Sequence, residues 1–224
     1  MNRVRRIDEK VPVRRVLISV SDKTDLETLV SGLVAVDDLI LYSTGGTYRH
    51  IAAMLGDRAR ERLRQVSDYT GQPEMQGGLV KTLGYRIYLG LLSEPYNAAH
   101  DRDRERAGAD LVDMVVANLY PFQSVVAQSQ ADAEDARSNI DIGGPCMLRA
   151  AAKNYLRVAA VCDPADYQPI VDEISRNDGA TLLATRYRLA QKAFRHTAEY
   201  DRSIADFLSG QSPADAIAAY EVIP

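Results

Sequence analysis

The chain has 224 residues, which is enough for one large domain or two small ones with a buried core and no added disulfide or metal staples. Its hydrophobic fraction of 46% is that of an ordinary soluble globular protein, and 27 basic against 31 acidic residues give a net charge of −4. This charge balance does not suggest a nucleic-acid partner, and we expect none.

The sequence contains neither an apolar run long enough to cross a bilayer nor the apolar core of a secretory signal. We therefore expect no membrane association and a cytoplasmic location. Cys146 and Cys162 are the two cysteines, and they lie in no CxxC pattern and have no histidine nearby at metal spacing. We interpret both as small buried thiols and predict no metal site.

Residues 1–13 carry a basic cluster, Arg3, Arg5 and Arg6, followed directly by Asp8 and Glu9. Mixed charge of this kind at a terminus is typical of a solvated tail. We predict a flexible N-terminal arm over residues 1–13 and one domain over residues 14–210.

Five short runs rich in Val, Ile and Leu are typical of buried strands. They cover residues 16–20, 39–42, 65–67, 114–117 and 158–162, and the third is the weakest. Helical patterns lie between most of them. Asp22 is the expected N-cap of the first helix, residues 144–154 form another, and Pro164 opens a third.

Strands that alternate with helices indicate right-handed crossover units, and so a parallel sheet with helices on both faces. We predict an α/β fold of the doubly wound type, in which the ligand lies at the carboxyl ends of the strands. Residues 180–208 contain neither Pro nor Gly and predict a helical C-terminal extension that caps the domain or forms an interface. Residues 211–224 form a short tail.

Polar residues follow three of the predicted strands at their carboxyl ends, which share one edge of a parallel sheet. These residues are Ser19, Ser21 and Lys23 after the first strand, Ser43, Thr44, Gly45, Gly46 and Thr47 after the second, and Asn118 and Tyr120 after the fourth. Glycines let the backbone aim N–H groups at a ligand, and the N-terminus of the following helix favours negative charge. The pattern predicts a phosphate site. The Gly-Gly pair alone predicts only a tight turn and matches neither a Walker loop nor GxGxxG.

A second polar group lies further along the chain. Lys81 and Thr82 follow an irregular segment that contains Gly71, Pro73, Gly77 and Gly78, from which a lysine can reach into a cleft. Asp141 precedes a helix that ends near Lys153. Taken alone, these two are a helix-capping acid and a helix-end cation, and tertiary folding alone could bring them together.

Seven stretches, in this order, resemble the inosine monophosphate (IMP) cyclohydrolase domain. They are "RRVLISVSDKT" (14–24), "STGGT" (43–47), "VSDYTGQPEM" (66–75), "VKTL" (80–83), "NLYPF" (118–122), "NIDIGGPCMLRAAAKN" (139–154) and "KAFRHTAEYD" (192–201). That domain is the N-terminal half of a bifunctional purine-biosynthesis protein whose other half is the aminoimidazole carboxamide ribotide (AICAR) formyltransferase. The resemblance implies a methylglyoxal-synthase-like fold and the closure of formyl-AICAR to IMP with loss of water. It implies no metal or organic cofactor, and a homodimer.

The resemblance also implies roles for single residues. It assigns the 5′-phosphate of a phosphoribosyl carboxamide nucleotide to Ser21, Lys23 and residues 43–47, and places Ser19 near the heterocycle. The remaining substrate contacts fall on Thr82, Asn118, Ile142, Gly143 and Gly144, and the catalytic group is Lys81, Tyr120, Asp141 and Lys153. Lys81 would contact the carboxamide oxygen. Because the chain stops where the formyltransferase domain would begin, we expect that domain to be absent and a separate formyltransferase to supply the substrate.

The match fails beside Lys81. The family reads Arg-Val-Lys-Thr-Leu-His-Pro and then a second His, whereas this chain has Leu79 for the arginine, Gly84 and Tyr85 for His-Pro, and Tyr88 for the second His. Either Arg86 supplies the missing charge or the ligand differs. Three hypotheses follow: a cyclohydrolase for formyl-AICAR, a related enzyme for an analogue nucleotide in a specialised purine-analogue pathway, and a non-catalytic nucleotide-binding module.

Overall fold

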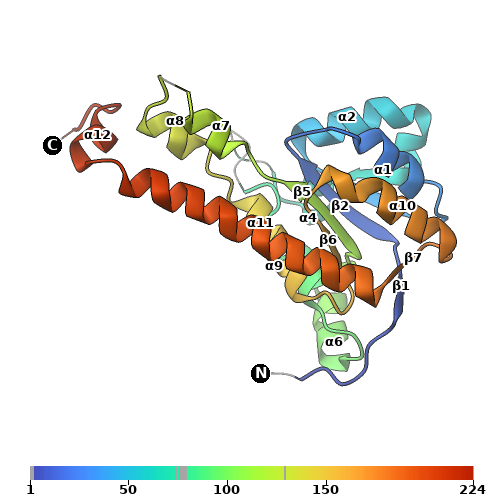
Figure 1. Ribbon diagram of the computed structural model, residues 1–224. Coiled ribbons are helices and arrows are strands. Elements are labelled where there is room, and N and C mark those ends of the chain that lie inside the picture. The colour runs from blue at the N-terminus through green and yellow to red at the C-terminus, as the bar shows by residue number, and fades with distance from the viewer. Residues whose placement is uncertain (1–2, 74, 76–79, 129, 224) are drawn as a thin grey trace.

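A five-stranded parallel sheet forms the centre of the computed structural model, which describes residues 3–73, 75, 80–128 and 130–223 (Figure 1). Its strands are β2 (Arg15–Val20), β3 (Ile40–Ser43), β4 (Leu63–Gln65), β5 (Met114–Asn118) and β6 (Ala159–Val161). Their order across the sheet is β4-β3-β2-β5-β6. The chain builds outward from β2 to β4 and then returns to the other side of β2, so the order reverses between β2 and β5. The predicted doubly wound parallel sheet is confirmed.

Helices cover both faces of the sheet, as predicted (Figure 1). Three pack on one face, namely α1 (Leu26–Leu33), α2 (Gly45–Leu55) and α10 (Tyr167–Arg176). The other face carries α4 (Val66–Thr70), α5 (Tyr85–Leu92), α9 (Gly143–Lys153) and α11 (Leu183–Ser209). Successive strand residues point to opposite faces, so Val16 and Ile18 pack with α1 and α10 while Leu17 packs with α5 and α9. Strands β2, β3 and β5 are therefore apolar over most of their length, as is typical of strands covered on both faces.

Shorter helices complete the chain. They are η1 (Gly56–Arg58), α3 (Ala59–Arg62), α6 (Ala98–Arg106), α7 (Phe122–Val126), α8 (Ala133–Ser138), η3 (Pro164–Asp166) and α12 (Pro213–Ile217). The predicted helix start at Pro164 is confirmed as η3, whose N-cap Asp163 accepts a hydrogen bond from the Ala165 N–H. The 3-10 turn leads directly into α10.

Two local predictions are wrong. The third strand covers Leu63–Gln65 rather than residues 65–67, because Leu63 pairs with Leu41 and Val66 already begins α4 with its side chain in the core. Asp22 does not cap α1. Its carboxylate accepts hydrogen bonds from the N–H and hydroxyl of Thr24, and α1 begins at Leu26 with Asp25 in the N-cap position.

Part of the predicted N-terminal arm belongs to the fold. Strand β1 (Lys10–Pro12) pairs antiparallel with β7 (Ala180–Leu182), in a two-stranded ribbon separate from the main sheet. Arg186, which is fully buried, donates hydrogen bonds to the carbonyl oxygens of Asp8 (2.8 Å) and Thr181 (2.6 Å). The prediction of a flexible arm is therefore wrong for residues 8–13, since backbone pairing with a distant strand leaves no local signal.

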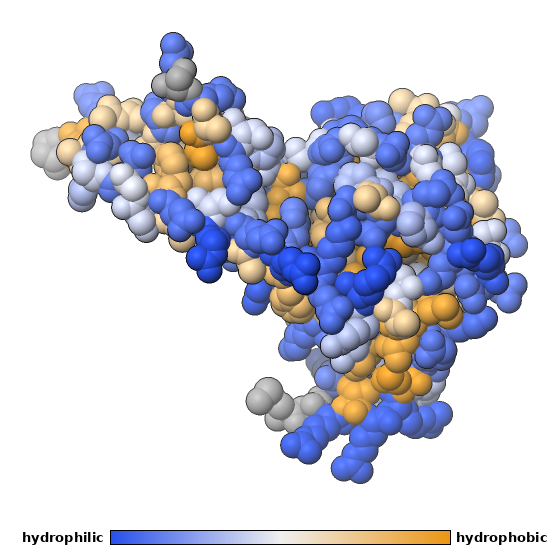
Figure 2. Space-filling view, viewed as in Figure 1, coloured by the Kyte–Doolittle hydropathy of each residue, from blue (hydrophilic) through white to orange (hydrophobic). Residues whose placement is uncertain are grey.

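The predicted C-terminal extension is confirmed as α11, which packs on α9 and β6 and then runs past the sheet to α7 (Figure 1). Beyond α11, α12 contacts α8. Figure 2 shows orange hydrophobic residues among blue ones over this projecting end. Leu208, Ile217 and Val222 expose 56%, 53% and 69% of their surface there. In the described part of the chain, no helix is long and apolar enough to span a membrane.

A buried ion pair ties the end of α9 to the start of the sheet. Arg157 donates to the Asp113 carboxylate (2.7 Å) and to the carbonyl oxygens of Gly90 and Val112. The same carboxylate accepts the N–H groups of Arg14 and Arg15 at the start of β2. Burial raises the pKa of Asp113 and lowers that of Arg157, so desolvation opposes both charges.

Replacing one partner of this pair should cost more stability than the pair itself contributes. We expect Arg157→Met to lower the free energy of unfolding by about 3–5 kcal/mol, because the Asp113 carboxylate stays buried without its cation. Urea unfolding measures this. Arg106→Met, which removes the exposed pair with Asp103, is the control and should cost at most about 1 kcal/mol. Equal losses in the two variants would contradict the assignment.

Candidate functional site

A cavity of about 360 Å³ opens at the carboxyl ends of β2, β3 and β5. In folds of this kind ligands bind at that edge, where the strand order reverses. Most of the predicted site residues line it: Ser19, Ser21, Lys23, Thr44, Gly46, Thr47, Lys81, Thr82, Asn118, Tyr120, Asp141, Ile142, Gly143 and Gly144. Five segments of the sequence, around residues 19–23, 44–47, 81–82, 118–120 and 141–144, thus meet in one cavity.

Asn118, at the end of β5, holds the loop after β2 in place. Its Oδ1 accepts the N–H groups of Ser21 (2.6 Å) and Asp22 (3.0 Å), and its Nδ2 donates to the Asp22 carbonyl oxygen (2.7 Å). Lys23 Nζ donates back to the Ser21 carbonyl oxygen (3.2 Å). The amide of Asn118 therefore orients the loop that carries Ser21 and Lys23 along the cavity wall.

The loop after β3 divides into structural and cavity-lining residues. Ser43 is fully buried and donates to the Ile18 carbonyl oxygen, away from the cavity lining. The Thr47 hydroxyl bonds both the N–H and the carbonyl oxygen of Val20, which ties α2 to the end of β2. Thr44 and Gly46 line the cavity at the start of α2. This placement puts the helix N-terminus, with its free N–H groups, at the cavity wall.

Gly45 and Lys81 come into direct contact. Gly45 has a positive φ of 48°, which glycine adopts without strain. A Cβ atom at this position would lie 2.8 Å from Lys81 Nζ. The ammonium of Lys81 therefore rests against the backbone at the start of α2, in a space that only glycine leaves open.

The segment around Lys81 packs on the start of α9. A Cβ atom at Gly143 would lie 2.9 Å from Thr82 Oγ1, and Thr82 is buried. Val80, just before Lys81, has a positive φ of 58°, which is strained for a β-branched residue. Gly77, Gly78 and Leu79, which the sequence analysis placed in this loop, lie outside the described residues.

Arg86 does not replace the missing arginine of the family pattern. Its guanidinium donates to the Tyr69 carbonyl oxygen (3.0 Å) and lies near Gly108, and Arg86 is not among the cavity-lining residues. Tyr88 packs against the core instead of facing the cavity. In the described part of this segment, Val80 and Leu83 line the cavity beside Lys81 and Thr82, and all four residues match the family pattern.

Asp141 caps α9 from within the cavity. Its Oδ1 accepts the Gly144 N–H (2.9 Å), as the sequence predicted for a capping acid, and the carboxylate also accepts the Tyr120 N–H. A Cβ atom at Gly144 would lie 2.7 Å from Asp141 Oδ2, so glycine is needed for this approach. Burial raises the pKa of Asp141 above its ordinary value, against the opposing effect of the two N–H groups.

Tyr120 faces the same carboxylate. Burial raises the pKa of its phenol, and the negative charge of Asp141 raises it further. At neutral pH Tyr120 is therefore a protonated donor beside an acidic group whose own pKa is raised. Such a pair is suited to moving protons.

Lys153 does not join this group. It is exposed at the C-terminal end of α9, whereas Asp141 lies at the N-terminal end. The ten residue steps from Gly143 to Lys153 correspond to about 15 Å along a helix axis. Within one chain, the structure does not bring Lys153 to the cavity, and the tertiary convergence that the resemblance implied is not observed.

Other residues of the cavity wall carried no predictive pattern. They are Val20, Val80, Leu83, Ser138, Ile140 and Met147. Most are apolar and looked like core positions. The one available signal was that these residues are close in the sequence to the polar residues predicted to form the site.

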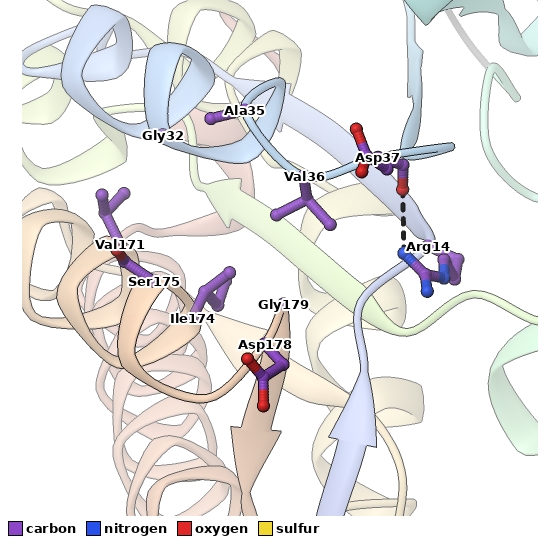
Figure 3. A pocket seen from close by; sticks show the side chains of 10 residues that line it. All are labelled: Arg14, Gly32, Ala35, Val36, Asp37, Val171, Ile174, Ser175, Asp178 and Gly179. Carbon is purple, nitrogen blue, oxygen red and sulfur yellow. Dashed lines mark hydrogen bonds between the residues drawn. The ribbon is translucent and has the colours of Figure 1, made fainter.

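A larger cavity, of about 580 Å³, lies on the opposite side of the molecule, near the amino ends of the strands (Figure 3). Val36, Val171 and Ile174 point into it, with Asp178 at its rim and Arg14 bonded to the Asp37 carbonyl oxygen. None of the predicted site residues lines it. No cluster of three or more metal-ligating side chains occurs among the residues that the structure describes.

Comparison with known families defines the class of protein. The family model described as "MGS-like domain" matches residues 25–146, and the one described as "AICARFT/IMPCHase bienzyme" matches residues 151–222. The chain belongs to the MGS-like domain family. The methylglyoxal-synthase-like fold that the resemblance implied is confirmed.

Two of the similar proteins are bifunctional purine biosynthesis proteins, and a third is a solved structure. The bifunctional purine biosynthesis protein PurH of Enterococcus faecalis is 47% identical over 198 residues, which are 88% of this chain and 37% of that protein. The PurH of Chlorobium phaeobacteroides is 42% identical over 204 residues, covering 91% of this chain and 38% of that protein. The chain thus spans less than two fifths of the curated relatives it matches. The crystal structure of ForH is 31% identical with a TM-score of 0.75, covering 88% of this chain and 99% of ForH.

The contact between Gly45 and Lys81 can be tested with IMP, the nucleotide that the resemblance implies, as the ligand. Gly45→Ala should weaken IMP binding by roughly tenfold to a hundredfold, since the displaced Lys81 ammonium loses a charge-assisted contact of about 1.5–3 kcal/mol with the ligand. Isothermal titration calorimetry measures the affinity.

Gly56→Ala is the matched control. Gly56 has a similar positive φ of 54°, but a Cβ atom there would meet nothing within 4 Å. Both variants place an alanine at a positive φ, so both should lose stability. Unchanged IMP affinity in Gly45→Ala, or equal weakening in both, would disprove the placement of Lys81 at this loop.

Proposed function

We propose that the chain closes the purine ring, converting formyl-AICAR to IMP with loss of water. The observation that carries this proposal is the meeting of Lys81, Tyr120 and Asp141 in one cavity beside a helix N-terminus. The similarity to PurH proteins supports it. In a non-catalytic binding module nothing would require a lysine, a phenol and a half-buried carboxyl to converge, so we do not favour that hypothesis.

The substrate is a phosphoribosyl carboxamide nucleotide with its phosphate at the loops after β2 and β3. Ser21, Lys23 and the N-terminus of α2 supply hydroxyl, ammonium and backbone N–H donors. Ser43 is not among these donors because its hydroxyl is used inside the fold. In this assignment, the heterocyclic end of the nucleotide is contacted by Ser19, Thr82 and Lys81.

Ring closure joins the carboxamide nitrogen to the formyl carbon of the same molecule, so the site's main task is to hold the two groups close and coplanar. The Lys81 ammonium at the carboxamide oxygen favours the imidate-like form whose nitrogen attacks. The formyl oxygen becomes an oxyanion and is stabilised by backbone donors at the start of α9. These donors are the N–H groups of Ile142 and Gly143, because that of Gly144 is already bonded to Asp141.

Asp141 and Tyr120 complete the proton transfers. The attacking nitrogen gives up one proton, which Asp141 accepts, and the formamide nitrogen gives up a second as the C=N bond forms and the C–O bond breaks, so that the former formyl oxygen gains two protons and leaves as water. Tyr120 donates at that oxygen, and its proton is replaced from Asp141. No metal or organic cofactor is needed for this sequence, and Lys153 has no role in it within its own chain.

A second candidate is the same chemistry on a nucleotide with a different five-membered ring. It rests on the departures from the family pattern on either side of Lys81, where Leu79, Gly84, Tyr85 and Tyr88 stand in place of Arg, His, Pro and a second His. In this case the altered segment contacts the five-membered ring and selects the substrate, and the contacts to the phosphate and the catalytic contacts are unchanged. Parallel assays with formylated analogues separate the two candidates.

The expected partners are a formyltransferase that supplies the substrate and a second copy of this chain. Exposed apolar side chains at the projecting end of α11 and in the tail, among them Leu208 and Ile217, support a protein contact there. Analytical ultracentrifugation of the purified chain tests the homodimer.

The direct test mixes the protein with formyl-AICAR and follows IMP by absorbance against an enzyme-free sample. We expect turnover, and a loss of about 10²–10³-fold in kcat for Lys81→Ala, because the charge at the carboxamide oxygen is removed. Lys10→Ala, on the exposed strand β1, is the control and should behave as the wild type. Full activity in Lys81→Ala would rule out its role. Binding of IMP without turnover would favour the analogue substrate.

The pH dependence of kcat should report Asp141. Because Asp141 must be ionised to accept a proton and its pKa is raised, kcat should fall on acidification with an apparent pKa above 3.8. Tyr120, whose pKa lies above 10.0, should add no alkaline limb below that value. Asp141→Asn should lower kcat and remove the acidic limb. An acidic limb that persists in that variant would assign the proton transfer to another group.

A further inference from the structure

Tyr200, on α11, is buried and has no part in the chemistry proposed above. Its hydroxyl accepts a hydrogen bond from the Asp141 N–H (2.9 Å) and donates one to the Asn139 carbonyl oxygen (3.1 Å). One hydroxyl therefore fixes both ends of the short turn that delivers Asp141 to the cavity.

The ring of Tyr200 also contacts the second catalytic loop. It packs edge-on against Phe122, with ring centroids 6.2 Å apart and an angle of 68° between the planes. Phe122 lies two residues after Tyr120, and its N–H donates to the Tyr120 carbonyl oxygen (2.8 Å). Tyr200 thus touches the loop of Tyr120 through its ring and the loop of Asp141 through its hydroxyl.

These two loops depend on each other, because the Asp141 carboxylate accepts the N–H groups of both Gly144 and Tyr120. A shift of the Asp141 backbone would lengthen those bonds. Among the residues that the structure describes, Tyr200 is the side chain of α11 whose hydrogen bonds hold this backbone. The helix that carries it packs along α9 and β6, so the support is rigid.

We infer that Tyr200 is a positioning residue for the ring-closing reaction: it sets the geometry of Asp141 and Tyr120 without touching the substrate. This inference rests on the proposed function. Thr197 and Ala193 share the buried side of α11 with Tyr200, so its sequence spacing indicates only a core residue. The two hydrogen bonds of its hydroxyl distinguish Tyr200 from a residue that only packs in the core.

Tyr200→Phe tests the inference, because it keeps the ring on Phe122 and removes the two hydrogen bonds. We expect kcat to fall about tenfold, as for the loss of about 1.4 kcal/mol of hydrogen bonding, with little change in KM. The acidic limb of kcat should move to higher pH, since weakened N–H bonds to the carboxylate favour its neutral form. A merely structural role would change neither the limb nor the division between kcat and KM.

Tyr187→Phe is the matched control, since Tyr187 lies on the same helix, is half exposed and packs on Tyr155 away from the cavity. It should retain the wild-type kcat and pH profile. Wild-type kcat and pH profile in Tyr200→Phe would overturn the inference.

Hydrogen exchange measured by mass spectrometry gives a readout independent of turnover. Peptides that contain residues 139–144 should exchange faster in Tyr200→Phe than in Tyr187→Phe, because the Asp141 N–H loses its acceptor. If the wild-type chain fails to close formyl-AICAR, the proposed function falls, and the exchange still decides whether Tyr200 holds this turn. Equal exchange in both variants would then overturn the inference.

Discussion

The site depends on one carboxylate. Asp141 caps α9 through the Gly144 N–H and at the same time accepts the Tyr120 N–H, so the two loops that carry the proposed chemistry are joined at a single side chain. Donors at a helix N-terminus favour the ionised form of an acid, whereas burial favours the neutral form. Burial has the larger effect, so the pKa of Asp141 is raised. A carboxyl group with a raised pKa is suited to accepting a proton and then returning it.

The helix behind this carboxylate is anchored at its other end. Asn154, just after α9, donates to the carbonyl oxygens of Leu91 and Ser93, and Arg157 binds Asp113 at the start of β5. Buried polar groups of this kind are costly unless fully bonded, and here they join α9 to α5 and to the sheet. The N-terminus of α9 therefore holds a fixed position relative to the strand ends, and the cavity keeps its shape.

Much of the fold could be read from the sequence because apolar runs separated by helical periodicity specify a parallel sheet. The polar strand ends likewise predicted most of the cavity wall, since parallel strands place their carboxyl ends at one edge. Residues 8–13 and strand β7 were missed, because their pairing joins segments about 170 positions apart and shows no alternating pattern. Asp22 was misassigned since its carboxylate bonds Thr24 two residues on, a local turn that competes with helix capping.

The sequence by itself determined the fold class, the polar edge and the residue types available for chemistry, because these follow from periodicity and from local composition. Only the tertiary structure decided which of those residues meet. It brought Lys81 against Gly45 and placed Asp141 beside Tyr120, but it left Lys153 at the far end of α9 and turned Ser43 and Arg86 away from the cavity. Such outcomes depend on the direction of each side chain after packing, and no local pattern encodes that direction.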